Sequence, residues 1–230
     1  MAKCGGKKPD ESNQTDKENK GMPIQTFVFM DLEATGLPSG KKLPDVIELA
    51  MRAVPRKALT KASTEADEPR VQDKLLMCIT PEKPVVPRAQ KMTGLSKDML
   101  EKYGKQRTNK LLVVSVKSFL LRQAEPVCLV AHAGDRFDFK VLKREMGKVR
   151  TSDSFWNINL YTIDSLLFFQ KVLPGESHTL SDLCDNYLTY EPSSHTAEGD
   201  TETLLDLVSL PAFMCKFLNW TEQNKSEYEL

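Results

Sequence analysis

The chain has 230 residues, of which 40% are hydrophobic, and its 32 Lys and Arg residues equal its 32 Asp and Glu residues in number. This length allows one sizeable α/β domain, or two small ones, with a genuine core. The balanced charge excludes an overall basic field as an attraction for nucleic acid, so any such binding must rely on local patches or on metal ions.

The cysteines are odd in number and widely spaced, at positions 4, 78, 128, 184 and 215, and form no C-x-x-C pair. This pattern disfavours both a zinc knuckle and a disulfide framework. No apolar stretch approaches the roughly 20 residues that span a membrane, and the N-terminus lacks the apolar core of a secretory signal. We therefore expect a soluble, intracellular protein of the nucleus or the cytoplasm, without a membrane partner.

The first 22 residues are dominated by Lys, Gly, Asn, Gln, Asp and Glu, a composition that predicts a disordered tail. Three apolar stretches follow and predict strands that are adjacent in sequence. The predicted strands are 26–32, 45–54 and 71–80, with a polar stretch at 55–69 between the second and the third. They indicate a meander.

A proline-rich loop then leads into a short helix for which Ser96 is the expected N-cap. Beyond it, helices are predicted at 96–102, 109–122, 138–146, 179–188 and 197–219, and strands at 126–132 and 160–166. Three strands followed by alternating helices and strands predict an α/β fold with a central mixed sheet.

The first predicted strand ends in two acidic residues, Asp31 and Glu33, which lie two apart and therefore face the same side. Adjacent carboxylates repel each other unless a cation or a proton lies between them. An exposed strand end is the alternative, but Phe27 and Phe29 share that face, which favours a metal site.

Two further acidic clusters stand at similar positions: Asp135 and Asp138 follow a strand end, and Asp200 opens a helix beside His195. Taken singly, each is better explained as an ordinary acidic first turn that favours the helix dipole. Together they predict Mg²⁺ or Mn²⁺ rather than zinc, because carboxylate oxygens are hard ligands. Two such ions about 4 Å apart are the usual arrangement for cutting phosphodiesters. The imidazole of His195 could accept the proton of the attacking water.

Three segments carry a resemblance to a known family: FMDLEATGLP at 29–38, LVAHAGDRFDF at 129–139 and SHTAEGD at 194–200. In their order along the chain and in their amino-acid sequence, they resemble the three exonuclease motifs of the DEDDh (DnaQ-like) superfamily, most closely the three-prime repair exonuclease (TREX) family. RVQDKL at 70–75 and MTGLS at 92–96 resemble the intervening segments of that family. The resemblance covers about residues 24–218 and is closer to the short branch without a transmembrane tail.

This resemblance implies a ribonuclease H-like fold, with an exonuclease domain at 23–220 between an N-terminal tail at 1–22 and a C-terminal tail at 221–230. It also implies two Mg²⁺ ions, replaceable by Mn²⁺, and a histidine general base. The implied metal ligands are Asp31, Glu33, Asp138 and Asp200, and the implied base is His195. The residues implied to contact the substrate are Glu33, Ala34, Leu37, Pro38, Met92, Arg136 and His195. Lys140, Lys143 and Arg144 are either further phosphate contacts or a solvated helix face.

The implied activity is Mg²⁺-dependent 3′-to-5′ removal of nucleotides from single-stranded or frayed DNA ends, by a homodimer that pairs through the strand at 71–80. An exoribonuclease on the same scaffold is one alternative. A catalytically weakened nucleic-acid-binding relative is the other, because Ala133 stands where the family usually has Asn and removes an amide from the loop before Asp138.

Overall fold

The computed structural model describes residues 22–40, 42–65, 69–149, 158–189 and 195–230, so the predicted tail at 1–22 lies almost wholly outside the described residues. A six-stranded mixed sheet forms the centre, in the order β3-β2-β1-β4-β5-β6. The strands are β1 (Thr26–Ala34), β2 (Val46–Pro55), β3 (Asp73–Cys78), β4 (Val127–Ala131), β5 (Leu160–Asp164) and β6 (Ser226–Glu227). The predicted α/β class and mixed sheet are confirmed.

Strand β1 lies in the middle of the sheet, antiparallel to β2 and parallel to β4. Its side chains alternate between two buried layers, so Phe27 and Phe29 face one apolar cluster while Val28 and Met30 face another. A strand that is covered on both faces reads as a continuous apolar run. Against that background the two acids at its end are exceptional.

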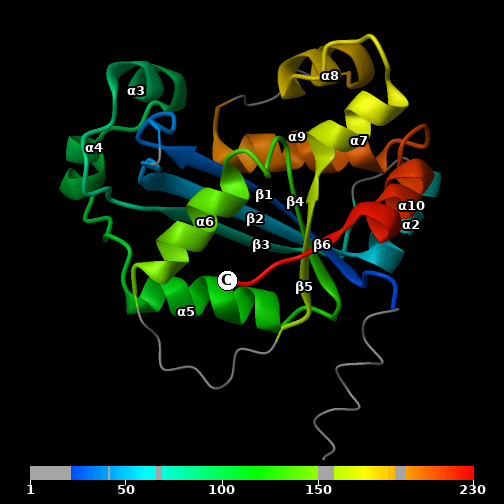
Figure 1. Ribbon diagram of the computed structural model, residues 1–230, viewed down its shortest axis with the longest axis horizontal. Coiled ribbons are helices and arrows are strands. Elements are labelled where there is room, and N and C mark those ends of the chain that lie inside the picture. The colour runs from blue at the N-terminus through cyan, green and yellow to red at the C-terminus, as the bar shows by residue number, and fades with distance from the viewer. Residues whose placement is uncertain (1–21, 41, 66–68, 150–157, 190–194) are drawn as a thin grey trace, which may run out of the picture.

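Helices cover both faces of the sheet and make a three-layer sandwich (Figure 1). One face packs against α2 (Arg56–Glu65), α7 (Ser165–Val172), α8 (Leu180–Tyr187), α9 (Ala197–Ser209) and α10 (Met214–Asn224). The other face packs against α5 (Lys110–Leu121) and α6 (Asp138–Gly147). The short helices α3 (Pro87–Thr93) and α4 (Lys97–Lys102) lie together at one corner, where Ser96 caps α4 as predicted.

Several predicted boundaries were wrong. Most of the expected polar stretch at 55–69 that is described is helix α2, and the proline-rich loop contains α3, which begins at a proline. The predicted strand 160–166 ends at Asp164, because that side chain accepts a hydrogen bond from the amide of Leu166 and starts α7.

The last predicted helix, 197–219, is two helices, α9 and α10, separated at Pro211. A residue before proline is disfavoured in the helical region, and Leu210 has φ −57° and ψ 139°. The expected C-terminal tail at 221–230 instead completes α10 and adds β6 at the edge of the sheet. There, Tyr228 donates a hydrogen bond to the carbonyl of Phe139 at 2.5 Å. Among the described residues, no helix is both long and apolar enough to cross a membrane.

Candidate metal centre and active site

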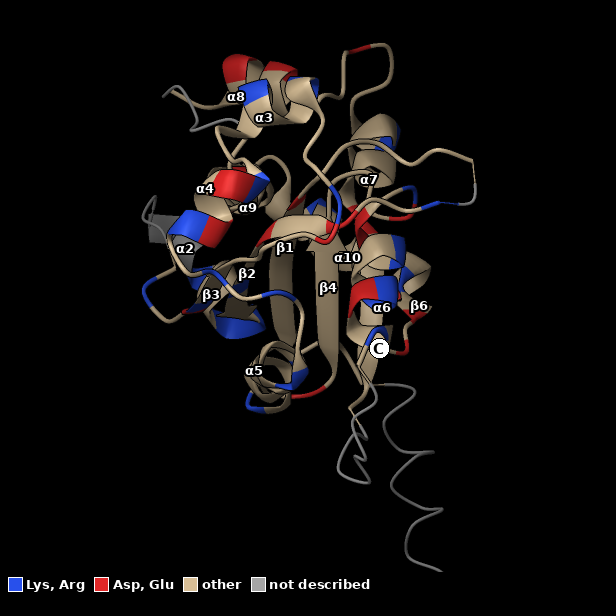
Figure 2. Ribbon diagram, turned by 90° about the vertical axis from the view of Figure 1, so that its left-hand side faces the viewer, with Lys and Arg blue, Asp and Glu red and all other residues tan. Residues whose placement is uncertain are grey.

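Three of the predicted carboxylates converge at the end of β1. Asp31, Glu33 and Asp200 each offer an oxygen, and these oxygens lie within 4.8 Å of one another. The pleat of β1 places the first two on the face that α9 covers, and Asp200 belongs to the first turn of α9. The Thr196 side chain fixes that turn by accepting the amide hydrogen of Gly199 at 3.1 Å. In Figure 2, acidic segments gather at the upper ends of β1 and β4, whereas both charge signs alternate over the outer helices.

Asp138 is the first residue of α6 and is 3% exposed. Its Oδ1 atom is buried and has no hydrogen-bond partner in the part of the chain that the structure describes. Burial, helped by the nearby charges of Asp164 and Asp200, raises the pKa of this carboxyl to about 7, although the backbone amides of Asp138 itself and of Leu32 act in the opposite direction. A buried, unpartnered carboxylate oxygen is costly unless a cation or a proton binds it.

The other three carboxyls are perturbed in the same direction. Burial, followed by the charges of neighbouring acids, raises the pKa of Glu33 to about 8 and holds the pKa of Asp31 well above its ordinary 3.8. Burial also raises the pKa of Asp200 to about 6, with His195 opposing the shift. Such a set of oxygens suits Mg²⁺ or Mn²⁺, and together with the unpartnered oxygen of Asp138 it fits a divalent cation.

His195 is exposed and lies two residues before α9. His195 lowers the pKa of the Asp200 carboxyl, so it lies beside the carboxylate cluster. Its φ of 66° lies in the left-handed region, which non-glycine residues seldom adopt outside functional sites. Ser194, the first residue of this motif, lies outside the described ranges.

The loop of the second motif, between β4 and α6, contains Ala133 with φ 59°. Asp164 at the end of β5 holds this loop: its Oδ1 accepts the amide hydrogen of Ala133 at 2.9 Å and its Oδ2 accepts that of Asp135 at 3.3 Å. The ring of His132 lies 3.0 Å from the hydroxyl of Ser165. The loop before Asp138 is therefore anchored through its backbone without an amide side chain at position 133. Asp135 itself is exposed.

Sequence reasoning missed two acids that shape this site, Asp164 and Glu48. Glu48 lies opposite Glu33 in the register of β1 and β2, and its Oε2 accepts the amide hydrogen of Ala197 at 2.8 Å. It thereby joins the sheet to the first turn of the helix that carries Asp200. The available signal was an acid inside a largely apolar strand, β2, which also contains Arg52.

A pocket of about 390 Å³ adjoins the carboxylates. Its lining consists of Leu32, Glu33, Ala34, Gly36, Leu37, Val86, Arg88, Ala89, Met92, Thr93 and Phe137. Of the predicted substrate contacts it includes Glu33, Ala34, Leu37 and Met92. Pro38, Arg136 and His195 are exposed and lie outside the lining. Arg88 and Phe137 are additions that the sequence did not suggest.

Comparisons with known proteins agree with this geometry. Residues 28–208 match the exonuclease family RNase_T. The chain is 37% identical to three-prime repair exonuclease 1 of Bos taurus over 202 residues, which are 80% of this chain but only 63% of that protein. It is 38% identical to three prime repair exonuclease 2 of Homo sapiens over 195 residues, covering 79% of this chain and 81% of that one.

Solved structures share the fold at lower identity. E. coli exonuclease I in complex with a dT13 oligonucleotide aligns with a TM-score of 0.64 at 16% identity, over 87% of this chain and 44% of that one. The nuclease domain of 3′hExo, a DEDDh family member bound to rAMP, aligns with a TM-score of 0.62 at 12% identity, over 90% and 98%. The family match over residues 28–208 and the relatives at 37–38% identity show that the chain belongs to the exonuclease family and, within it, to the three-prime repair exonucleases.

Proposed function

We propose that the protein is a Mg²⁺-dependent exonuclease that removes nucleotides from the 3′ ends of single-stranded or frayed DNA. The observation that carries the proposal is the convergence of Asp31, Glu33 and Asp200 within 4.8 Å. The buried, unpartnered oxygen of Asp138 extends this carboxylate cluster. Ordinary protein cores do not hold four such groups together without a counter-charge.

In this proposal Asp31, Glu33 and Asp200 hold one divalent cation, and Asp31 and Asp138 hold the second. Bound Mg²⁺ or Mn²⁺ supplies stabilisation of the phosphate oxygens and lowers the pKa of the attacking water. His195, on the exposed side of Asp200, accepts the proton of that water. Its position on a loop lets it approach the reacting phosphate once DNA is bound.

The adjoining pocket supports recognition of a terminal nucleotide. Leu37, Met92 and Phe137 provide apolar surfaces on which a base can stack, whatever its sequence. Glu33 and the backbone of Ala34 lie at the carboxylate end of the pocket, where they would contact the 3′ hydroxyl. A pocket that takes one terminal nucleotide beside the cations explains cleavage from an end rather than within a strand.

The test is degradation of a 5′-labelled DNA oligonucleotide, which should yield a ladder of products shortened from the 3′ end in Mg²⁺ or Mn²⁺ and none in EDTA. One structural neighbour is a 3′-exonuclease that recognises a histone mRNA stem-loop, so a matched RNA oligomer belongs in the same assay. Faster loss of RNA would favour the exoribonuclease. Tight binding of DNA without any cleavage would favour the weakened relative.

Replacing the proposed base is expected to affect turnover rather than binding. We expect His195→Ala to lower kcat by about 10²–10⁴-fold, the usual contribution of general base catalysis, with KM nearly unchanged. Because His195 is exposed, the melting temperature should not fall. Single-turnover cleavage with saturating oligonucleotide measures the effect, with His178→Ala as the histidine control. A full rate in His195→Ala would assign the proton to another group.

We also propose a homodimer formed through the edge strand β3. Exposed apolar side chains lie on and beside this edge, with Val71 64%, Leu76 47% and Leu111 70% exposed. An uncovered edge with apolar neighbours invites pairing with a second strand. Light scattering should give twice the chain mass for the wild type and one chain mass for Leu76→Lys. Leu167→Lys, at a site 44% exposed on α7, is the matched control and should remain dimeric.

A further inference from the structure

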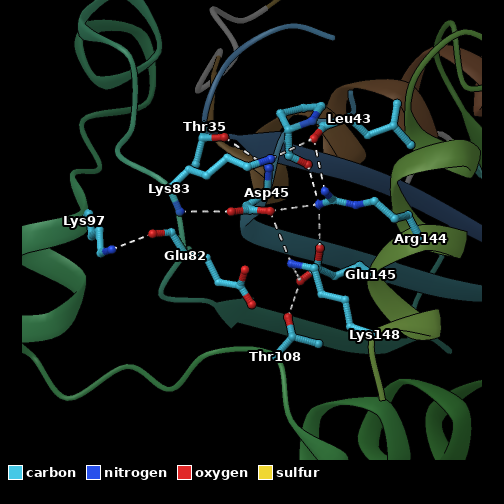
Figure 3. A network of polar contacts seen from close by, with 11 residues as sticks. Thr35, Leu43, Asp45, Glu82, Lys83, Lys97, Thr108, Arg144, Glu145 and Lys148 are labelled. Atoms are coloured by element: carbon cyan, nitrogen blue, oxygen red, sulfur yellow. Dashed lines mark hydrogen bonds and ion pairs between the residues drawn. The ribbon is translucent and has the colours of Figure 1, made fainter. Parts of the chain in front are cut away.

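A network of charged residues around two buried carboxylates joins α6 to the segments that follow β1 and β3 (Figure 3). The carboxylates of Asp45 and Glu145 are each only 2% exposed, and the cations of Arg144 and Lys148 bridge them. Sequence reasoning offered Arg144 as a phosphate contact. The structure shows that its guanidinium is instead occupied within the protein.

Asp45 binds three separate segments of the chain. Its Oδ2 accepts the amide hydrogen of Lys83 at 3.0 Å, in the loop between β3 and α3. Its Oδ1 accepts from Nη2 of Arg144 at 3.1 Å and from Nζ of Lys148 at 3.3 Å, both at the C-terminal end of α6. Its own amide donates to Oγ1 of Thr35 at 3.1 Å.

This carboxylate is ionised. Burial alone would raise the pKa of Asp45, but the amide of Lys83 and the cations of Lys148 and Arg144 outweigh burial and lower it. A charge in this position must keep its partners, because a buried ion that loses them is strongly destabilising.

Arg144 completes the connection between α6 and the loop that joins β1 to β2. Its Nη1 donates to the carbonyl of Leu43 at 3.0 Å and its Nη2 to the carbonyl of Pro44 at 2.6 Å. Only the planar guanidinium fork can reach two carbonyls and a carboxylate together, whereas an ammonium is a single point of charge. Glu145 accepts from Arg144 at 3.0 Å and from Lys148 at 2.9 Å, and the hydroxyl of Thr108 also donates to it.

The three segments joined by Asp45 also form the three walls of the pocket. The loop after β1 contributes Gly36 and Leu37, the α3 segment contributes Val86, Arg88 and Met92, and the entrance to α6 contributes Phe137. The backbone amide of Val86 donates a hydrogen bond to the carbonyl of Thr35 at 2.9 Å and so links the first two walls directly. Asp138 follows Phe137 directly, so α6 carries one wall and one of the proposed cation ligands.

We propose that Asp45 and Arg144 are positioning residues that hold the three walls of this pocket at the spacing required by the terminal nucleotide. Neither side chain lines the pocket, so they act through Thr35, Val86 and the axis of α6. The inference rests on the proposed function, since it takes the pocket to be the site of the 3′-terminal nucleotide.

The test measures KM and kcat separately for variants of Asp45 and Arg144. For Asp45→Asn and Arg144→Met we expect KM for a DNA oligonucleotide to rise about tenfold or more, while kcat at saturation falls less than about threefold. Arg144→Lys keeps the charge but loses the fork, and its KM should lie between those of the wild type and Arg144→Met. An oligonucleotide with 2-aminopurine at its 3′ end, bound in Ca²⁺ without turnover, should show a parallel loss of affinity.

The matched control removes a part-buried ion pair that does not border the pocket. Arg56 and Glu222 lie 2.5 Å apart and join β2 and α2 to α10. We expect Glu222→Gln to lower the melting temperature while KM stays at the wild-type value. A purely structural role for Asp45 would make the two substitutions behave alike.

Amide hydrogen exchange keeps this inference distinct from the proposed function. Exchange at Lys83 and Val86 should accelerate in Asp45→Asn and in Arg144→Lys relative to Glu222→Gln. If the wild type leaves DNA intact, the proposed function fails, while accelerated exchange still supports positioning of the walls. An unchanged KM in Arg144→Lys, with unchanged exchange at both amides, would overturn the inference even if Asp45→Asn does not fold.

Discussion

We expect Asp200→Asn to lower the rate of DNA cleavage by about 10³-fold or more, which corresponds to a loss of about 4 kcal/mol of transition-state stabilisation. Asp200 is one of three carboxylates whose oxygens lie within 4.8 Å. Asparagine retains the size of the side chain but removes the negative charge that would hold a cation between α9 and β1. The loss should appear in kcat, and higher Mn²⁺ should restore only a small part of it.

The control lies in the same helical turn. Glu198 is also in the first turn of α9 but is exposed and outside the cluster, so Glu198→Gln should cleave DNA at the wild-type rate. Pre-steady-state cleavage of a 3′-terminal nucleotide at saturating Mg²⁺ compares the two variants directly. Wild-type activity in Asp200→Asn would remove this carboxylate from the reaction.

The second large effect concerns stability without metal. In EDTA we expect the melting temperature to fall as pH rises from 5 to 8, by about 4–8 °C, since about 2 kcal/mol is lost and each kcal/mol is worth about 2–4 °C in a chain of this size. In the folded protein the pKa of Asp200 is about 6, that of Asp138 about 7 and that of Glu33 about 8, against ordinary values of 3.8 and 4.5. Folding therefore takes up protons in this range, and the stabilisation present below pH 4 is lost as pH rises through 6 to 8.

Mg²⁺ should reverse this trend, because it binds the ionised carboxylates of the folded state only. The increase in melting temperature on adding Mg²⁺ should be larger at pH 8 than at pH 5.5, and Mg²⁺ binding at pH 7 should release protons to the buffer. Asp31→Asn should be more stable than the wild type in EDTA, yet inactive, whereas Glu198→Gln should follow the wild type. A melting temperature in EDTA that rises with pH would contradict the raised pKa values.

The sequence alone predicted those parts of the fold and the site that interactions between residues near in sequence determine. The alternation along β1 places Asp31 and Glu33 on one face, and the caps at Ser96 and Asn109 start α4 and α5. The acids at the end of β1, after β4 and at the start of α9 were expected to form one site, because strand ends and helix starts are where α/β folds place ligands. Their roles as metal ligands remain proposals. The strand pattern accounts for Asp31 and Glu33, whereas Asp200 reaches them because α9 packs over β1.

Other features depend on contacts between distant segments and have no local signature. The hydrogen bond from Ala197 to Glu48 spans 149 positions, and those from Ala133 to Asp164 and from Arg144 to Pro44 span 31 and 100. The sequence failed to predict helix α2 for a different reason. Its charged and small residues are compatible with a helix or with a loop. The helix is favoured because it packs Leu59 into the core.

The placement of Asp200 on α9 also determines when the proposed activity can begin during synthesis. Proteins leave the ribosome N-terminus first, so Asp31 and Glu33 emerge long before the helix that packs over β1 and β2. Until α9 docks, the carboxylate cluster lacks one member and the amide of Ala197 cannot reach Glu48. A nascent chain would therefore carry no nuclease activity, and competence to cut would arise only as the last helices of the domain fold.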